Sequence, residues 1–239
     1  MTDVLILGSS KGLGKELYEL FKSNKYKVLG ISRTKGKQTD IVCDLSNKGQ
    51  VSKVVENISM KYMPRNIVFN AGQGRSSKDS LEERREELML QNFYTSKYFV
   101  EEFKKREKWM VNLESLTFIN SICALENFKC SEEYKISKSE LLKYSRAIAK
   151  EFIDYRVRVN SILPGNIMHE NSVWKKKFTT DQDAKNFVDK TMPFSDWIYP
   201  KDIFDTIEFF INNKNVVNTE IVLDGGQNLI SPNWSSTIN

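Results

Sequence analysis

A tyrosine and a lysine lie four positions apart in the stretch SEEYKISKSE, as Tyr134 and Lys138. The stretch is typical of a charged helix, and positions four apart on a helix share one face. A phenol has an unperturbed pKa of about 10, and a neighbouring ammonium lowers that pKa by stabilising the phenolate. The pair is therefore a candidate proton donor, although the same spacing also occurs by chance on solvated helices.

Two polar residues upstream are placed to complete such a site. Ser121 ends the apolar run TFINS, thirteen residues before Tyr134, where a hydroxyl can bond a reacting oxygen. Asn92 lies in the helical stretch that precedes this run. Together Asn92, Ser121, Tyr134 and Lys138 form the predicted catalytic set.

Apolar runs typical of buried strands alternate with helical patterns along the chain. The predicted strands are VLILG, YKVLGIS, DIVCDL, NIVFNAG, LTFINS, RVRVNSIL and TEIVLDGG, which begin at residues 4, 26, 40, 66, 116, 156 and 219. The predicted helices span residues 13–22, 49–60, 81–108, 132–152 and 201–211. This alternation predicts an α/β fold, a Rossmann-type doubly wound parallel sheet with helices on both faces that binds ligands at the carboxyl ends of its strands. We assign all 239 residues to this single domain.

The stretch 164–200 is longer than ordinary connections in such folds, so it is either a lid or a disordered insertion. Its aromatic residues favour a substrate lid: Trp174, Phe178, Phe187, Phe194 and Trp197. The lysines at 175, 176 and 177 can attract a phosphate or carboxylate of the substrate, although such runs are more often simply solvated.

The first predicted strand runs into a glycine-rich turn, LGSSKGLG, where a helix begins. Gly8, Gly12 and Gly14 permit a tight turn and close backbone approach, and the helix N-terminus offers free N–H groups to a phosphate. The GxxxGxG spacing departs from the GxGxxG pattern of many dinucleotide sites, so the position after the first strand is what favours a dinucleotide here.

The second predicted strand ends in GISRTKG, without an acidic residue. NAD-binding proteins of this fold commonly place an acid there to bond the ribose hydroxyls. Arg33 can instead pair with a 2′-phosphate through its planar guanidinium, and Lys11 in the glycine turn adds a second cation. These residues predict NADP(H) as the cofactor, with two ordinary surface cations as the alternative.

The motifs follow one another in a distinctive order. GSSKGLG is followed by CDLSN, FNAG, Asn92, Ser121, the Tyr134 and Lys138 pair, RVNSILPGNI and LDGG. In this order and spacing the chain resembles the short-chain dehydrogenase/reductase family over nearly its whole length. The resemblance implies an oxidoreductase that interconverts a carbonyl and an alcohol by direct hydride transfer from or to nicotinamide, with no metal.

The resemblance also implies a role for each candidate residue. Tyr134 exchanges a proton with the substrate oxygen, Lys138 lowers the tyrosine pKa and holds the nicotinamide ribose, and Ser121 hydrogen-bonds the substrate. Asn92 anchors a water that links the lysine to solvent. The residues implied in cofactor binding, besides Tyr134 and Lys138, are Gly8, Ser10, Lys11, Gly12, Leu13, Gly14, Arg33, Asp44 and Leu45 (at the adenine), Asn70, Ala71, Gly72, Pro164, Gly165 and Ile167 (at the nicotinamide carboxamide).

The chain departs from the family pattern at three points. FNAG replaces the frequent NNAG, and Ile122 follows the serine where a small residue is usual. Many members carry a threonine two residues after the isoleucine of PGxI to bond the cofactor, whereas this chain has His169, its single histidine. His169 is either a cofactor or substrate contact or a partly exposed loop residue.

Composition narrows the function classes. Thirty-six Lys and Arg are scattered among 31 Asp and Glu for a net charge of +5, which indicates a solvated surface and not a nucleic-acid interface. No apolar run is long enough for a membrane span, and the first residues lack the features of a signal peptide, so we expect a cytoplasmic protein. Cys43, Cys123 and Cys130 lack metal-like pairing and are interpreted as small buried residues.

The identity of the substrate does not follow from these residues: a 3-oxoacyl thioester and a sugar or nucleotide-linked sugar both remain open. By resemblance, the long helices at 81–108 and 132–152 imply a homodimer or homotetramer. A catalytically silent, NADP(H)-binding regulator on the same fold is the alternative function, and the complete catalytic set argues against it.

Overall fold

A computed structural model of the chain describes residues 2–230, apart from residues 126, 127, 129, 171, 179 and 195. Its centre is a seven-stranded sheet in the order β3-β2-β1-β4-β5-β6-β7, and all its neighbouring strands run parallel. Each predicted apolar run contributes a strand, which confirms the doubly wound fold. The strands are β1 (Val4–Leu7), β2 (Val28–Ser32), β3 (Ile41–Val42), β4 (Asn66–Phe69), β5 (Ser115–Ile119), β6 (Arg158–Pro164) and β7 (Glu220–Leu223).

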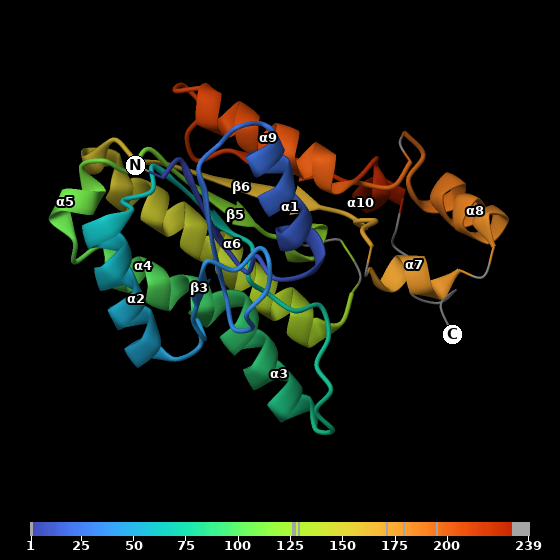
Figure 1. Cartoon of the computed structure of the whole chain (residues 1–239). Coiled ribbons are helices and arrows are strands. Elements are labelled where there is room, and N and C mark those ends of the chain that lie inside the picture. Colours follow the sequence, from blue (N-terminus) through green and yellow to red (C-terminus); the bar gives the residue numbers. More distant parts are fainter. Residues whose placement is uncertain are drawn as a thin grey trace.

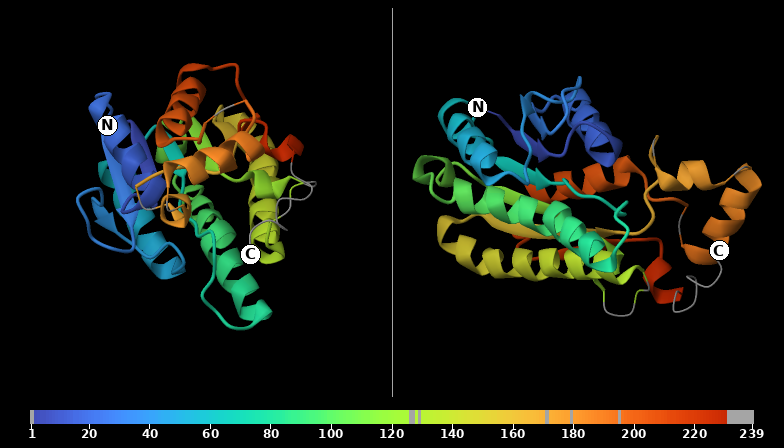
Figure 2. Two further views of the ribbon diagram at one scale, coloured as in Figure 1. Left: turned by 90° about the vertical axis from the view of Figure 1, so that its right-hand side faces the viewer. Right: turned by 90° about the horizontal axis from the view of Figure 1, so that it is seen from below.

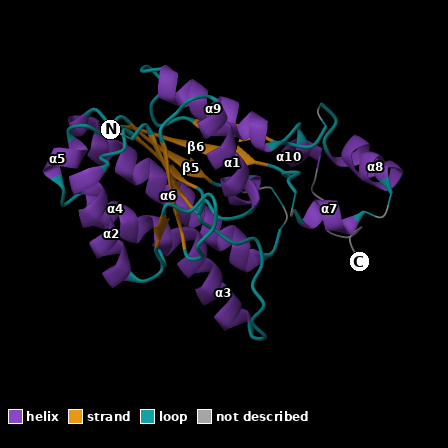
Figure 3. Ribbon diagram, viewed as in Figure 1, coloured by secondary structure: helices purple, strands orange, loops and turns teal. Residues whose placement is uncertain are grey.

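Helices cover both faces of the sheet (Figure 1, Figure 3). Helices α1 and α9 pack together on one face, and α2, α4 and α6 cover the other. Two shorter helices, α7 and α8, lie beyond one end of the sheet (Figure 2). The α-helices are α1 (Gly12–Ser23), α2 (Lys48–Lys61), α3 (Leu81–Met89), α4 (Thr95–Phe103), α5 (Glu107–Met110), α6 (Glu132–Phe152), α7 (Val173–Lys177), α8 (Asp181–Thr191), α9 (Pro200–Asn212) and α10 (Gln227–Ile230).

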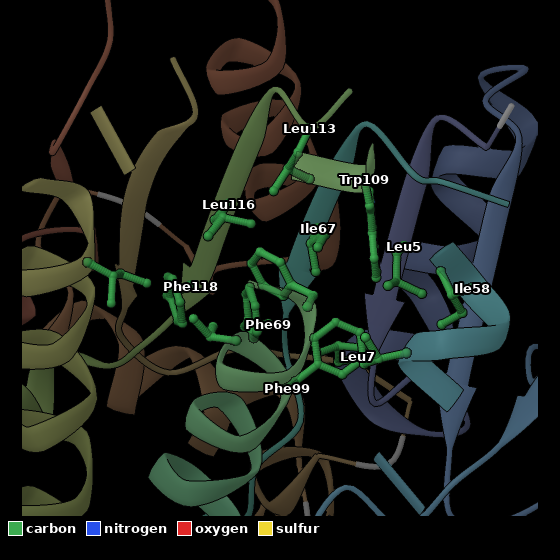
Figure 4. Packing of buried hydrophobic residues seen from close by; sticks show 14 of the residues in the cluster. Leu5, Leu7, Ile58, Ile67, Phe69, Phe99, Trp109, Leu113, Leu116 and Phe118 are labelled. Atoms are coloured by element: carbon green, nitrogen blue, oxygen red, sulfur yellow. The ribbon is translucent and has the colours of Figure 1, made fainter. Parts of the chain in front are cut away.

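The larger of the two hydrophobic cores that flank the sheet includes side chains of β4 and β5, the strands that lead into the site. Phe69 of β4 and Phe118 of β5 stack with ring centroids 4.3 Å apart, and Phe99 of α4 packs edge-on against Phe69 (Figure 4). The buried Trp109 donates its indole N–H to the Pro64 carbonyl at 2.8 Å. Fully burying one side chain of this size stabilises the fold by about 2 kcal/mol, so this packing fixes β4 and β5 relative to each other.

The strand order creates a switch point between β1 and β4. Leu7 pairs with Phe69, so the residues that follow β1 and β4 lie side by side. The chain leaves these two strands toward opposite sides of the sheet, which opens a crevice at their carboxyl ends. The residues that follow β5 and β6 extend the same edge.

Two predicted segments differ from the structure. The helix predicted over 81–108 is divided: a π-helical turn, Leu90–Tyr94, separates α3 from α4, and α5 is a distinct short helix. The described residues of the stretch 164–200 include two helices that were not predicted, α7 and α8, and the role of this stretch as a substrate lid stays a prediction. Among the described residues, no helix is both long and apolar enough to cross a membrane.

Candidate active site

A cleft of about 910 Å³ opens at the carboxyl edge of the sheet. It brings together residues that follow six strands, β1 to β6, and that are far apart in the sequence. The predicted site residues that line it are Gly8, Ser10, Lys11, Gly12, Leu13, Arg33, Leu45, Asn70, Ala71, Gly72, Ser121, Tyr134, Lys138, Pro164, Gly165 and Ile167. Asn92, Gly14 and Asp44 do not line it.

Ser121, Tyr134 and Lys138 converge at the start of α6. Ser121 follows β5, and its hydroxyl oxygen accepts a hydrogen bond from the backbone N–H of Cys123 at 3.1 Å. Tyr134 and Lys138 lie in the first two turns of α6, where the helical spacing puts both on the cleft side. The Lys138 ammonium donates to the Ile119 carbonyl at 3.2 Å and lies 5.9 Å from the centroid of the Tyr134 ring.

Burial acts on both titratable groups of this set. It raises the pKa of the Tyr134 phenol, a negative charge on Cys123 adds to the rise, and a hydrogen bond with the Ser121 hydroxyl opposes it. Burial also lowers the pKa of Lys138 to about 8. Desolvation is thus the largest influence on the pKa of the phenol in this arrangement, and a lowering of that pKa by Lys138 stays a prediction.

Asn92 does not line the cleft itself, but its side chain binds the backbone of Gln73, which does. Its side-chain oxygen accepts from the Gln73 backbone N–H at 2.7 Å, and its amide group donates to the Gln73 carbonyl and the Ser137 hydroxyl, each at 3.0 Å. The π-helical turn places this fully buried side chain between the loop after β4 and α6. Extra-wide helical turns of this kind are frequent at functional sites.

The glycine turn brings backbone close to backbone at the first strand. Gly8 has a φ of +89°, and a Cβ there would lie 2.8 Å from the Ala71 Cα. A Cβ on Gly14 would lie 1.9 Å from the Gly8 carbonyl oxygen, so Gly14 serves the contact between α1 and β1 and does not face the cleft. The implied contact of Gly14 with a cofactor is thus replaced by a packing role.

The cleft is positively charged throughout. Five cationic side chains line it, and none of its described lining residues is an aspartate or glutamate. Arg33 and Lys11 lie at the ends of β2 and β1, as the sequence predicts. An anionic dinucleotide fits this lining, and its phosphates are offered backbone N–H groups at the start of α1. The five are Lys11, Arg33, Lys35, Arg75 and Lys138.

Asp44 differs from its implied place at the adenine. Its carboxylate accepts hydrogen bonds from the backbone N–H and the hydroxyl of Ser46, at 3.0 and 2.7 Å. Leu45 and Cys43, on either side of it, line the cleft instead. In this conformation Asp44 stabilises the turn after β3. Its neighbours Cys43 and Leu45 provide apolar contacts to the cleft.

Two functional candidates, Asn120 and His169, are clearer in the structure than in the sequence. Asn120 precedes Ser121, is only 3% exposed and lines the cleft, yet neither polar atom of its side chain has a partner among the described residues. His169 also lines the cleft with an unpartnered, buried Nδ1, and its ring packs against Gly12. Unpartnered buried polar atoms are costly, so both side chains are suited to bond a ligand. A polar residue next to Ser121 was the only sequence signal for Asn120.

Two cysteines adjoin the catalytic hydroxyl, which the sequence did not indicate. Hydrogen bonds from the Cys130 thiol and the Ser121 hydroxyl, with the charge of Lys138, hold the pKa of Cys123 below its usual value. The same interaction, together with burial, raises the pKa of Cys130. All three cysteines are free thiols.

The segment 164–200 covers one side of the cleft. Trp197 packs against three aromatic rings, those of Trp174, Phe178 and Phe187, at centroid distances of 5.7 to 5.9 Å. A parallel bridge between Ile167 and Ile198 closes the base of the segment. Phe194, in contrast, is 86% exposed and lies outside this aromatic cluster. A second cavity of about 640 Å³ lies beside the cluster, and Lys175 and His169 are among its lining residues.

The family described as enoyl-(acyl carrier protein) reductase matches residues 19–228, which include Ser121, Tyr134 and Lys138 and exclude the glycine turn. The chain belongs to the short-chain dehydrogenase/reductase family. It is therefore an oxidoreductase of that family, as the order of its motifs predicted.

Individual relatives of this short-chain dehydrogenase/reductase are distant. It is 25% identical to carbonyl reductase family member 4 of Xenopus laevis, over 94% of this chain and 97% of that protein. It is 23% identical to the 3-oxoacyl-[acyl-carrier-protein] reductase of Bos taurus, over 94% and 97%. An NADPH-bound short-chain oxidoreductase of Pseudomonas aeruginosa PAO1 has the same fold, with a TM-score of 0.81, 22% identity and coverage of 95% and 98%.

Proposed function

We propose that the protein is an NADP(H)-dependent reductase that converts a carbonyl group to a secondary alcohol. The observation that carries the proposal is the placement of Ser121, Tyr134 and Lys138 in one cleft with a glycine turn and five cations. A 3-oxoacyl thioester, the substrate class in the name of the Bos taurus relative, and a sugar or nucleotide-linked sugar are the two substrate classes considered.

The lining of the cleft fits NADP(H). The N–H groups at the start of α1 bind the pyrophosphate, and Arg33 with Lys11 binds the 2′-phosphate. The missing acid at the end of β2 disfavours NAD(H), whose free ribose diol needs an acceptor. Asn120 and His169 supply the remaining polar contacts from the middle of the cleft.

Tyr134 is the proton donor in this mechanism. Because its pKa is raised, the phenol carries its proton at neutral pH, as an acid that serves a carbonyl reduction must. Ser121 donates a hydrogen bond to the carbonyl oxygen and polarises it. When NADPH is bound, it supplies the hydride that reduces the carbonyl carbon. As the phenol gives up its proton, the Lys138 ammonium stabilises the phenolate.

Substitution of Tyr134 by Phe tests the proposal. We expect Tyr134→Phe to lower kcat by at least about 100-fold with any ketone that the wild type reduces, because loss of a positioned acid has effects of that order. NADPH affinity, measured by fluorescence titration, should remain nearly intact. Tyr144→Phe removes the same atom from the same helix, away from the cleft, and serves as the control.

Wild-type turnover that survives in Tyr134→Phe would overturn the assignment of the acid. NADPH binding by the wild type without turnover of any ketone, acyl thioester or sugar nucleotide would instead support the silent regulator.

A further inference from the structure

Two cations without acidic partners belong to segments that contribute to the lining of the cleft, the loop after β4 and α7. Arg75 lies in the loop after β4 and lines the cleft. Lys177 is the last residue of α7, and Val173, four residues earlier on the same helix face, lines the cleft. In the part of the chain that the structure describes, neither side chain forms an ion pair with a carboxylate.

The aromatic cluster of the lid fixes the Lys177 ammonium in place. Its Nζ lies 5.6 Å from the ring centroid of Trp174 and 6.0 Å from that of Phe187. The two rings stack on each other with centroids 5.2 Å apart. A cation over aromatic faces is attracted to them, so the ammonium is oriented although the side chain is exposed.

The two charges act on each other. Partial burial lowers the pKa of Lys177, and the positive charge of Arg75 lowers it further. Like charges at this range disfavour each other, and an anion bound between them would turn both interactions into attractions. The chain itself provides no carboxylate for this purpose among the described residues that line the cleft.

Strand order separates this pair from the predicted 2′-phosphate site. Lys11 and Arg33 follow β1 and β2, on one side of the switch point, whereas Arg75 follows β4 on the other side. β4 neighbours β5, and Ser121 stands just beyond the end of β5. Arg75 and Lys177 therefore face the space in which a substrate meets Ser121 and Tyr134.

We infer that the substrate is a carbonyl compound that also carries a phosphate or carboxylate, and that Arg75 and Lys177 bind this anionic group. Ser121 and Tyr134 hold the carbonyl of the same molecule. Two-point attachment orients the carbonyl, and an anion shared by Arg75 and Lys177 ties the lid to the loop after β4. The inference rests on the proposed function, whose substrate it narrows.

Matched pairs of ketones test the inference and separate the two anionic groups. Dihydroxyacetone phosphate is compared with dihydroxyacetone, and 4-oxopentanoate with its methyl ester, each at saturating NADPH. We expect the charged member of at least one pair to have a kcat/KM about tenfold higher, as a charge-assisted contact of moderate strength provides. That ratio should fall toward one in Arg75→Gln and in Lys177→Gln.

Lys176→Gln is the matched control, because it removes the same charge from the same short helix at a side chain that, unlike Lys177, is not placed over the rings of Trp174 and Phe187. Its ratio should equal that of the wild type. Raising the ionic strength should reduce the wild-type ratio, since exposed charges are screened.

A binding measurement keeps the inference independent of turnover. Inorganic phosphate and acetate are titrated by calorimetry into the protein saturated with NADP⁺, and into its Arg75→Gln, Lys177→Gln double variant. Binding of either anion to the wild type that the double variant lacks supports the inference. Equal turnover of charged and neutral ketones, with no such binding, would overturn it and leave the proposed reductase standing. Failure to reduce any ketone would count against the proposed function, and calorimetry would still decide the anion site.

Discussion

Desolvation governs the chemistry of individual residues in this cleft. Lys138 is only 5% exposed, and burial brings its pKa to about 8, close enough to neutrality for its charge to depend on the surroundings. The pKa of the half-buried Tyr134 shifts in the opposite direction, upward, so its phenol stays protonated. A site with a neutral acid beside a removable positive charge is suited to give up a proton and then stabilise the resulting anion.

The proposed preference for NADP(H) depends on Arg33. We expect Arg33→Ala to weaken the binding of NADPH by at least about tenfold and the binding of NADH much less, because only NADPH has the 2′-phosphate that a guanidinium pairs with. Dissociation constants for both cofactors, measured by fluorescence titration, check this. Lys37→Ala removes a nearby exposed charge that does not line the cleft, and should change neither constant. A similar loss for both cofactors would remove the argument for NADP(H).

Two elements shape the surroundings of the predicted catalytic set. The π-helical turn at Leu90–Tyr94 directs Asn92 onto the backbone of Gln73, which holds the loop that leads to Arg75. The lid, α7 with α8, has an apolar cluster of its own, separate from the cores of the sheet. A lid with its own core can move or loosen as a unit while the sheet stays intact.

Trp197 is the centre of that cluster. We expect Trp197→Ala to remove about 3 to 5 kcal/mol of packing locally, so that amide hydrogen exchange in α7 and α8 speeds up while β1, β4 and β5 stay protected. Hydrogen exchange followed by mass spectrometry measures the exchange rates of these helices and of these strands in one experiment. The control is Phe194→Ala, since this side chain is 86% exposed. Loosening of the sheet to the same extent would show that the lid is not an independent unit.

At the scale of the whole molecule, assembly is the open question. The segment 81–108, which contains α3 and α4, and the helix α6 are the elements through which we expect two or four copies to associate, by resemblance to the family. Ala147 is an exposed small residue in the middle of α6, which suits close approach of a second helix.

A large side chain at Ala147 should therefore prevent assembly. We expect the wild type to have the mass of a dimer or tetramer by light scattering, and Ala147→Arg to shift it toward a monomer, because a bulky charge holds the helices apart. Val111→Arg adds the same side chain at a position that is 81% exposed just after α5, and should leave the mass unchanged. A wild-type monomer, or an unchanged mass in Ala147→Arg, would contradict the expected interface.

The seven strands and most helices could be predicted because their signals are local. A run such as Val4–Leu7 is apolar at every position, as a parallel strand buried on both faces must be, and the structure buries all four residues. The helix at 81–108 was predicted as continuous because a π-helical turn shifts the hydrophobic pattern by only one residue, which periodicity does not resolve. The helices α7 and α8 were not predicted, although the aromatic residues of 164–200 favoured a lid, because how those rings pack on one another is decided only in the folded segment.

By itself, the sequence determined the sheet and the family and predicted the catalytic set, because strand patterns and the spacing of Tyr134 and Lys138 are properties of neighbouring residues. Tertiary structure alone decided which candidates reach the cleft. Gly14 packs α1 against β1 and Asp44 stabilises a turn, so neither lines the cleft, whereas Asn120 and Arg75 do. The charge of Arg75 acts on Lys177 although the two residues are far apart in the sequence, because side-chain charges interact through space in the folded chain.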